Sequence, residues 1–277
     1  MRWRPVAAIV RKDVLTVLRN RGVRLPLMIT PFLVLIVVPA ALVLGADLLV
    51  AASPVPIEGL IGSAPFGDSG ADTGAATDTA VADPRSEWVL FVLDVFLAPL
   101  FLLIPLVVAT VIAADSFAGE RERGTLEALL HSPTSDRELL VGKFLAAWLP
   151  ALVVSFVGFA AYSLLANLLA WPSLQRVFFP TPTWLVLAFW VSPALAGLGL
   201  SVMVVASSRV KSLQAAHQVG SLLVLPIVVL MAAQIAGLTL LDLRWVTLLG
   251  AGLWVAVGLL LGAAGRTLRR ERLAQRL

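Results

Sequence analysis

The sequence predicts an all-α polytopic membrane protein with six transmembrane helices, an amphipathic N-terminal helix and both termini in the cytoplasm. Its 277 residues are 59% hydrophobic and only 14% charged, whereas soluble domains average about 45–50% apolar and about 25% charged residues. The charges are gathered between long apolar stretches, and a membrane-spanning helix needs roughly 20 mostly apolar residues. A soluble enzyme or a nucleic-acid-binding protein is therefore excluded.

Six stretches without a charged residue are long enough to cross a bilayer. They contain 22, 20, 32, 32, 30 and 21 residues. Allowing for interfacial residues at their ends, we expect transmembrane helices at 25–46, 88–114, 143–170, 183–207, 212–236 and 244–265. The chain 1–277 is then a single domain, in which 47–87 forms an external loop and 115–142 a cytoplasmic segment.

Lysine and arginine are distributed unevenly between the two sides of the predicted membrane. Because consecutive connecting segments alternate between sides, one side collects 18 of the 21 basic residues. The other side has only Arg85, Arg176 and Arg244. Basic residues mark the cytoplasmic side. Both termini are therefore expected in the cytoplasm, which an even number of spans also requires.

Residues 1–22 are expected to form an amphipathic helix in the cytoplasmic interface. Apolar residues recur at i, i+3 and i+4 spacing, namely Trp3, Val6, Ile9, Val10, Val14, Val17 and Leu18. The other face is basic and carries Arg2, Arg4, Arg11, Lys12 and Arg19. Such a helix beside a span places its arginines against anionic lipid head groups. The alternative is a simple retention anchor.

Three polar residues near the ends of spans are candidates for the transport pathway. Asp94 lies six residues beyond Trp88, roughly 9 Å deeper in the membrane, and ionisable residues inside a membrane are functional candidates. The alternative is that Asp94 faces water or pairs with Arg85. His217 and Gln218 lie just inside the cytoplasmic end of the fifth predicted span. They are candidates for a gate, and the alternative is that they form interhelical hydrogen bonds. No catalytic pair and no metal-ligand cluster is expected, so the chain is not predicted to be an enzyme.

The stretch between the second and third predicted spans is too structured for a plain connector. Residues 120–123 alternate in charge, and Gly124 then interrupts the helix. A short amphipathic helix at 125–130 ends before Pro133, and a capping box at 135–138 starts the next helix. A short helix with exposed leucines needs a groove to fill, in lipid or in a partner protein.

This stretch resembles the hallmark of type-2 ATP-binding-cassette (ABC) permeases. From Glu120 onward it reads Glu-x-Glu-x-Gly-Thr-Leu-Glu-x-Leu-Leu, then Pro-x-Ser, Glu-Leu and finally Gly-Lys at Lys143. The six spans and the N-terminal helix, which is the elbow helix of that family, extend the resemblance over essentially the whole chain. The resemblance implies that 115–142 contains a coupling helix that docks on an ATPase. The implied ATPase-coupling residues are Glu120, Glu122, Gly124, Thr125, Leu126, Glu127 and Leu130.

The resemblance also implies an exporter in a prokaryotic plasma membrane. Two permease subunits, identical or different, pair in the lipid bilayer, and two copies of an ABC ATPase subunit bind below them. ATP and Mg would bind to the ATPase, with no cofactor in this chain. The sequence itself supports the expectation that ATP does not bind to this chain. Gly119 and Gly124 have the spacing of the glycines in a phosphate-binding loop, but the lysine that such a loop requires is absent. The external segment at 237–243 is too short for the re-entrant helices of some family members.

A stand-alone secondary transporter or channel is the alternative function. Such proteins usually show internal repeats and charged residues near the membrane midplane, and neither feature is evident in this sequence. The mostly Leu, Val, Ala and Phe spans suit an amphipathic or lipid-like substrate better than a small ion.

Overall fold

The computed structural model describes residues 3–45, 84–119, 136–207, 213–235 and 241–267. Every regular element in these residues is a helix, and they include no strand. Six of the described helical stretches are long and apolar enough to cross a membrane: Leu27–Leu44, Trp88–Ser116, Glu138–Leu174, Pro182–Ser207, Gln214–Gln234 and Leu243–Ala263. The predicted all-α fold with six candidate spans is therefore confirmed.

Three of the six spans combine α-helix with a short π-helical segment, labelled η. In chain order the elements are α1 (Trp3–Arg19), α2 (Arg21–Phe32), η1 (Leu33–Val37), α3 (Val38–Leu44), α6 (Pro84–Leu90), η3 (Phe91–Phe96), α7 (Leu97–Ala113), η4 (Ala114–Gly119), α10 (Asp136–Leu174), α11 (Pro182–Val186), η5 (Leu187–Val191), α12 (Ser192–Ser207), α13 (Leu213–Leu222), α14 (Leu225–Ile235) and α15 (Leu243–Thr267). The longest helix, α10, extends beyond the predicted third span, 143–170, at both ends.

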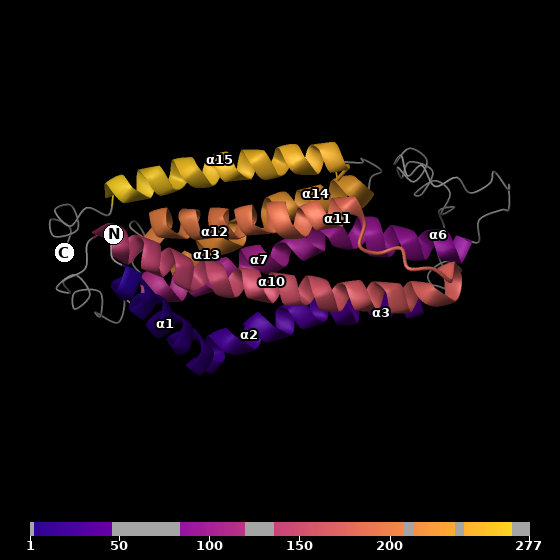
Figure 1. Cartoon of the computed structure of the whole chain (residues 1–277), viewed down its shortest axis with the longest axis horizontal. Helices are drawn as coiled ribbons and strands as arrows, with labels where there is room; N and C mark the ends of the chain where they lie inside the picture. Colours follow the sequence, from indigo (N-terminus) through magenta and orange to yellow (C-terminus); the bar gives the residue numbers. More distant parts are fainter. Residues whose placement is uncertain (1–2, 46–83, 120–135, 208–212, 236–240, 268–277) are drawn as a thin grey trace.

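The helices form one elongated bundle (Figure 1). The second and fourth spans form its core, since 67% of each of their most apolar windows is buried, against 17–28% for the other four. α12 packs between α7 and α15, while α10 packs against α7 on one side and α1 on another. The exposed apolar side chains of the outer helices are suited to lipid contact, because lipid tails are as apolar as they are.

Small residues allow the core helices to approach closely. A Cβ placed on Gly199 of α12 would lie 3.0 Å from side-chain atoms of both Leu106 and Thr110 of α7. Ser155 of α10 and Ser192 of α12 are both fully buried, and a hydrogen bond of 2.8 Å connects their hydroxyl groups. Buried polar groups need such partners, so these contacts fix how α12 sits between its neighbours.

Different elements lie at the two ends of the bundle. The start of α1 and the end of α15 lie at the same end (Figure 1), as an even number of spans requires. We call this the α1 end; it also carries η4, α13 and the first turn of α10. The opposite end, which we call the α6 end, carries α6, α11 and the last turns of α10 (Figure 1). The site described next lies at the α1 end.

Candidate functional site

A charged residue interrupts the buried face of α1. The stripe that α1 turns toward the bundle consists of Val6, Ile9, Asp13 and Val17, which are 2–8% exposed. Their spacing follows the helical repeat, so all four share one face. Trp3, which belongs to the predicted apolar face, is instead 68% exposed. Part of that face is therefore covered by protein.

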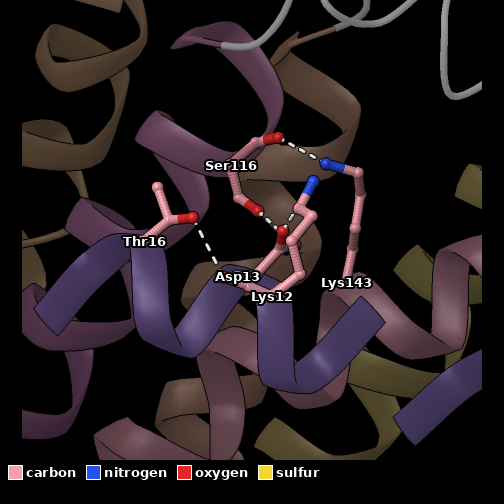
Figure 2. Close-up of polar contacts among 5 residues, drawn as sticks. All are labelled: Lys12, Asp13, Thr16, Ser116 and Lys143. Atoms are coloured by element: carbon pink, nitrogen blue, oxygen red, sulfur yellow. Dashed lines mark hydrogen bonds and ion pairs between the residues drawn. The ribbon is translucent and has the colours of Figure 1, made fainter. Parts of the chain in front are cut away.

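The buried carboxylate of Asp13 is stabilised by two neighbours (Figure 2). Ser116 of η4 donates from its hydroxyl to Oδ2 of Asp13 at 3.1 Å. The ammonium group of Lys12 lies 3.0 Å from Oδ1, although half of the Lys12 side chain is exposed. A buried carboxylate without such partners would be strongly unfavourable. Asp13 thus binds the base of the second span to α1.

Ser116 also connects to the third span through its backbone. Its carbonyl oxygen accepts a hydrogen bond of 2.6 Å from the ammonium group of Lys143, which is only 1% exposed (Figure 2). This hydrogen bond from a buried ammonium group joins the end of the second span to the start of the third. We refer to Lys12, Asp13, Ser116 and Lys143 as the Asp13 cluster.

Close packing accompanies this polar contact. A Cβ built on Gly142 of α10 would lie 3.1 Å from Cβ of Ile9 and 3.1 Å from its Cγ2. Such a distance is shorter than ordinary van der Waals contact, so Gly142 is the residue type that lets α1 lie against α10. Ile9 and Asp13 are one helical turn apart. α1 therefore meets the third span with one turn and the second span with the next.

Two further acidic residues are buried at the same end. Asp115 of η4 is 6% exposed and Glu138 of α10 is 4% exposed, and both are engaged in polar interactions. Burial of three carboxylates and one ammonium group at one end of the bundle is unusual, because charged side chains are almost never fully buried unless paired. The ionisable groups therefore mark this end as the candidate functional site.

The predicted ATPase-coupling residues lie between these flanks but outside the described residues. They are Glu120, Glu122, Gly124, Thr125, Leu126, Glu127 and Leu130. What is described is the pair of helices that enter and leave their segment, η4 and α10. The sequence motif pointed to Lys143, whereas Asp13 and Ser116 were missed. An acid at a buried-stripe position of an otherwise apolar face was the signal available for Asp13.

Asp94, a predicted pathway residue, is held in a network at the α6 end. Its carboxylate Oδ1 accepts from the hydroxyl of Thr181 at 3.0 Å, and its carbonyl accepts from the indole of Trp184 at 2.9 Å. Tyr162 donates from its hydroxyl to the carbonyl of Leu93, the preceding residue. Trp184 and Tyr162 are fully buried, and buried indole and phenol groups need such acceptors. These contacts join η3, α10 and α11.

Asn167 provides a second connection at the α6 end, which the sequence reasoning did not assign. Its amide nitrogen donates to the carbonyl of Phe179 at 2.8 Å, and its Oδ1 accepts from the backbone amides of Phe178 and Phe179 at 3.1 and 3.2 Å. One side chain thus satisfies three backbone groups of the α10–α11 connection. An asparagine in an apolar helix, close to a proline-rich turn, was the available signal.

The other two predicted pathway residues lie far from Asp94. His217 and Gln218 are exposed on α13, which packs on η4 at the α1 end. Asp94 lies in η3, toward the other end of the same span. The structure therefore does not bring the three residues together, and a transport role for each stays a prediction. Among the described residues, no group of three or more His, Cys, Asp or Glu side chains is arranged to hold a metal ion.

A bundle of six candidate spans, with buried charges at the end where its amphipathic helix packs, defines a multi-pass membrane protein. A family model described as "ABC-2 family transporter protein" matches residues 7–244, which is most of the chain. The chain therefore belongs to this family and is a membrane component of an ABC-2 type transporter. No curated protein matches the sequence. Permeases of this family typically lack an ATPase domain and work with ATPase subunits.

Proposed function

We propose that this chain is the permease subunit of an ATP-driven exporter in a prokaryotic plasma membrane. Two permease subunits form the translocation pathway, and two copies of a separate ATPase, which bind ATP and Mg, drive it. The segment 115–142 couples the ATPase to the membrane helices. The membership of the ABC-2 family supports the class, and the geometry of the α1 end supports the place of coupling.

One observation carries the coupling proposal. Ser116 and Lys143 lie on the two helices that enter and leave residues 120–135, and they are joined by a hydrogen bond of 2.6 Å. Movement of the residues between them then acts on the second and third spans together. Since the second span is packed tightly against the fourth at Gly199, the displacement continues into the core of the bundle.

The resulting mechanism is a shift between two packed states. Closure of the ATPases on ATP displaces the segment, and the second and third spans tilt as a pair. Closely packed interfaces favour discrete arrangements over continuous deformation, so a small movement at one end switches access at the other. ATP acts on this equilibrium only through its different affinity for the two ATPase arrangements.

Co-expression with each ABC ATPase encoded in the same genome tests the proposal. In the variant Glu122→Ala with Leu126→Ala, we expect about tenfold less ATPase to co-purify, a loss of roughly 1.4 kcal/mol in binding. The matched control, Glu58→Ala with Leu60→Ala, changes the same residue types in the 47–87 loop and should retain the ATPase. Equal co-purification for both variants would place coupling elsewhere.

A stand-alone secondary transporter or channel remains the competing function, and the same experiment separates the two. Such a protein would not retain the ATPase even as the unaltered chain. It would also show no dependence on ATP. Failure of the unaltered chain to stimulate or bind the ATPase therefore contradicts the proposed function itself, whereas failure of the variant pair contradicts only the site of coupling.

A further inference from the structure

α1 and the first span are joined by a bend at Asn20, about two helical turns beyond Asp13. α1 ends at Arg19 and α2 begins at Arg21, and the two helices meet at an angle (Figure 1). The backbone hydrogen bonds around Asn20 continue across the bend, from its amide to Thr16 at 3.0 Å and from the amide of Arg24 to its carbonyl at 2.9 Å. The bend is therefore a continuous kink, through which a displacement of α1 reaches α2.

α1 is attached to both helices that flank the coupling segment. Ile9 packs on Gly142 of the third span, and Asp13 accepts from Ser116 of the second. Of these contacts, only the one from Asp13 is polar. The carboxylate of Asp13 is only 5% exposed, and a buried carboxylate that loses its partners costs free energy. Asp13 therefore favours the one position of α1 in which its partners are in place, more strongly than an apolar residue would.

We infer that Asp13 is a positioning residue that fastens α1 to the base of the second span, one helical turn from the contact of Ile9 with the third span. α1 then moves with the coupling segment and carries that movement through the kink at Asn20 into the first span. This inference rests on the proposed function. It adds a third span to the two that the segment joins directly, and it assigns a role to a residue that touches neither ATP nor the predicted coupling helix residues.

The first test measures ATP turnover by the complex with the ABC ATPase that the unaltered chain retains. In Asp13→Ala, we expect kcat to fall about tenfold, with the KM for ATP and the co-purified amount of ATPase unchanged, because the nucleotide site lies in the partner. Asp13→Asn retains an oxygen that accepts from Ser116 and should stay within about threefold of the unaltered complex. If Asp13→Ala does not fold, Ser116→Ala replaces it, since this change removes only the hydroxyl. An unchanged kcat in the folded variant overturns the inference.

The second test restores the attachment covalently. The sequence has no cysteine, and Ile9 Cβ lies 3.1 Å from a Cβ built on Gly142, close to the roughly 3.5–4.5 Å that a disulfide requires. In the Asp13→Ala background, an oxidised Ile9→Cys and Gly142→Cys pair should return kcat to within about threefold of the unaltered complex. Reductant should remove this rescue, while leaving the cysteine-free permease complex unaffected. A disulfide that forms without rescue overturns the inference.

The rate of disulfide formation in the permease alone separates this inference from the proposed function. With Asp13 present, we expect the Ile9→Cys and Gly142→Cys pair to oxidise several times faster than in Asp13→Ala. This comparison needs no ATPase. If the ATPase does not bind the unaltered chain, the proposed function fails; equal oxidation rates contradict the attachment by Asp13 whatever the ATPase does.

Discussion

The two ends of the bundle are held together by different chemistry. At the α1 end, a buried carboxylate and a buried ammonium group meet on Ser116, with the half-exposed Lys12 beside them. At the α6 end, neutral side chains donate to backbone carbonyls of η3 and to the carboxylate of Asp94, and aromatic rings pack around them, as where Tyr162 stacks on Trp184 with centroids 5.0 Å apart.

This difference has a mechanical consequence. Interlocked rings and buried neutral hydrogen bonds lose burial and partners together when they separate, so they favour one arrangement. At the α1 end, the buried Asp13 and Lys143 require their contacts with Ser116, whereas the half-exposed Lys12 can exchange its contact for water at lower cost. We therefore expect the α6 end to act as a rigid block, and the α1 end to rearrange when a partner binds by exchanging its exposed contacts while Asp13 and Lys143 keep theirs.

The largest effect is expected from removing the ring at the centre of the α6 end. Trp184 is fully buried and lies 5.0 Å from the rings of both Tyr162 and Phe179. Trp184→Ala leaves a cavity and removes the hydrogen bond to the carbonyl of Asp94, and should destabilise the protein by about 3 kcal/mol. Thermal unfolding of the purified protein in detergent measures this loss.

Trp171→Ala is the matched control for this substitution. Trp171 lies near the same end of the bundle but is 53% exposed, so its removal opens no cavity and should change stability by less than about 0.5 kcal/mol. Equal losses for the two tryptophans would mean that the aromatic cluster does not hold the α6 end together.

An intermediate effect is expected at Asn167. Asn167→Ala leaves the backbone amides of Phe178 and Phe179 and the carbonyl of Phe179 without this partner, and each unsatisfied buried group costs about 1–3 kcal/mol. Because the connection is close to the bundle surface and water replaces part of the loss, we expect about 2 kcal/mol in all. Faster hydrogen exchange at the amides of Phe178 and Phe179 should accompany the loss.

Ser163→Ala serves as the control for Asn167. The Ser163 hydroxyl donates only to the carbonyl of Phe159, one turn earlier in the same helix, so its removal should leave the exchange of the two phenylalanine amides unchanged. Accelerated exchange in both variants would indicate a general loosening of α10 and not the release of the α10–α11 connection.

The fold was largely predictable from the sequence because it depends on local quantities. The length of each apolar stretch determines whether it can span a bilayer, and the amphipathic repeat of the N-terminal region needs no knowledge of its neighbours. The six candidate spans and the helix at Trp3–Arg19 follow from these patterns. The family was also recognisable, since its motif lies in one continuous stretch.

The contacts of the site were not predictable in the same way, because they join distant parts of the chain. Asp13 meets Ser116 across 103 residues, and Asp94 meets Thr181 across 87. A helical repeat shows that Asp13 lies beside Ile9 and Val17, but not that a hydroxyl is available opposite it. The position of a charged residue within an apolar stripe therefore predicts a buried polar contact, although it does not identify the partner.

The smallest effect is expected where the α1 end meets water. Lys12 is 49% exposed and its ammonium group lies 3.0 Å from Asp13, and ion pairs with exposed partners contribute about 0–1 kcal/mol. Lys12→Gln should therefore lower the stability by about 0.5 kcal/mol, and the difference should shrink further in 1 M salt, where the screening length falls to about 3 Å. Thermal unfolding at low and high salt measures both quantities.

Arg11→Gln, which removes the same charge from the exposed face of α1, controls for the change in net charge. If Lys12→Gln destabilised the protein as much as Trp184→Ala, the α1 end would be as rigidly held as the α6 end, and the division into a fixed and a rearranging end would be wrong.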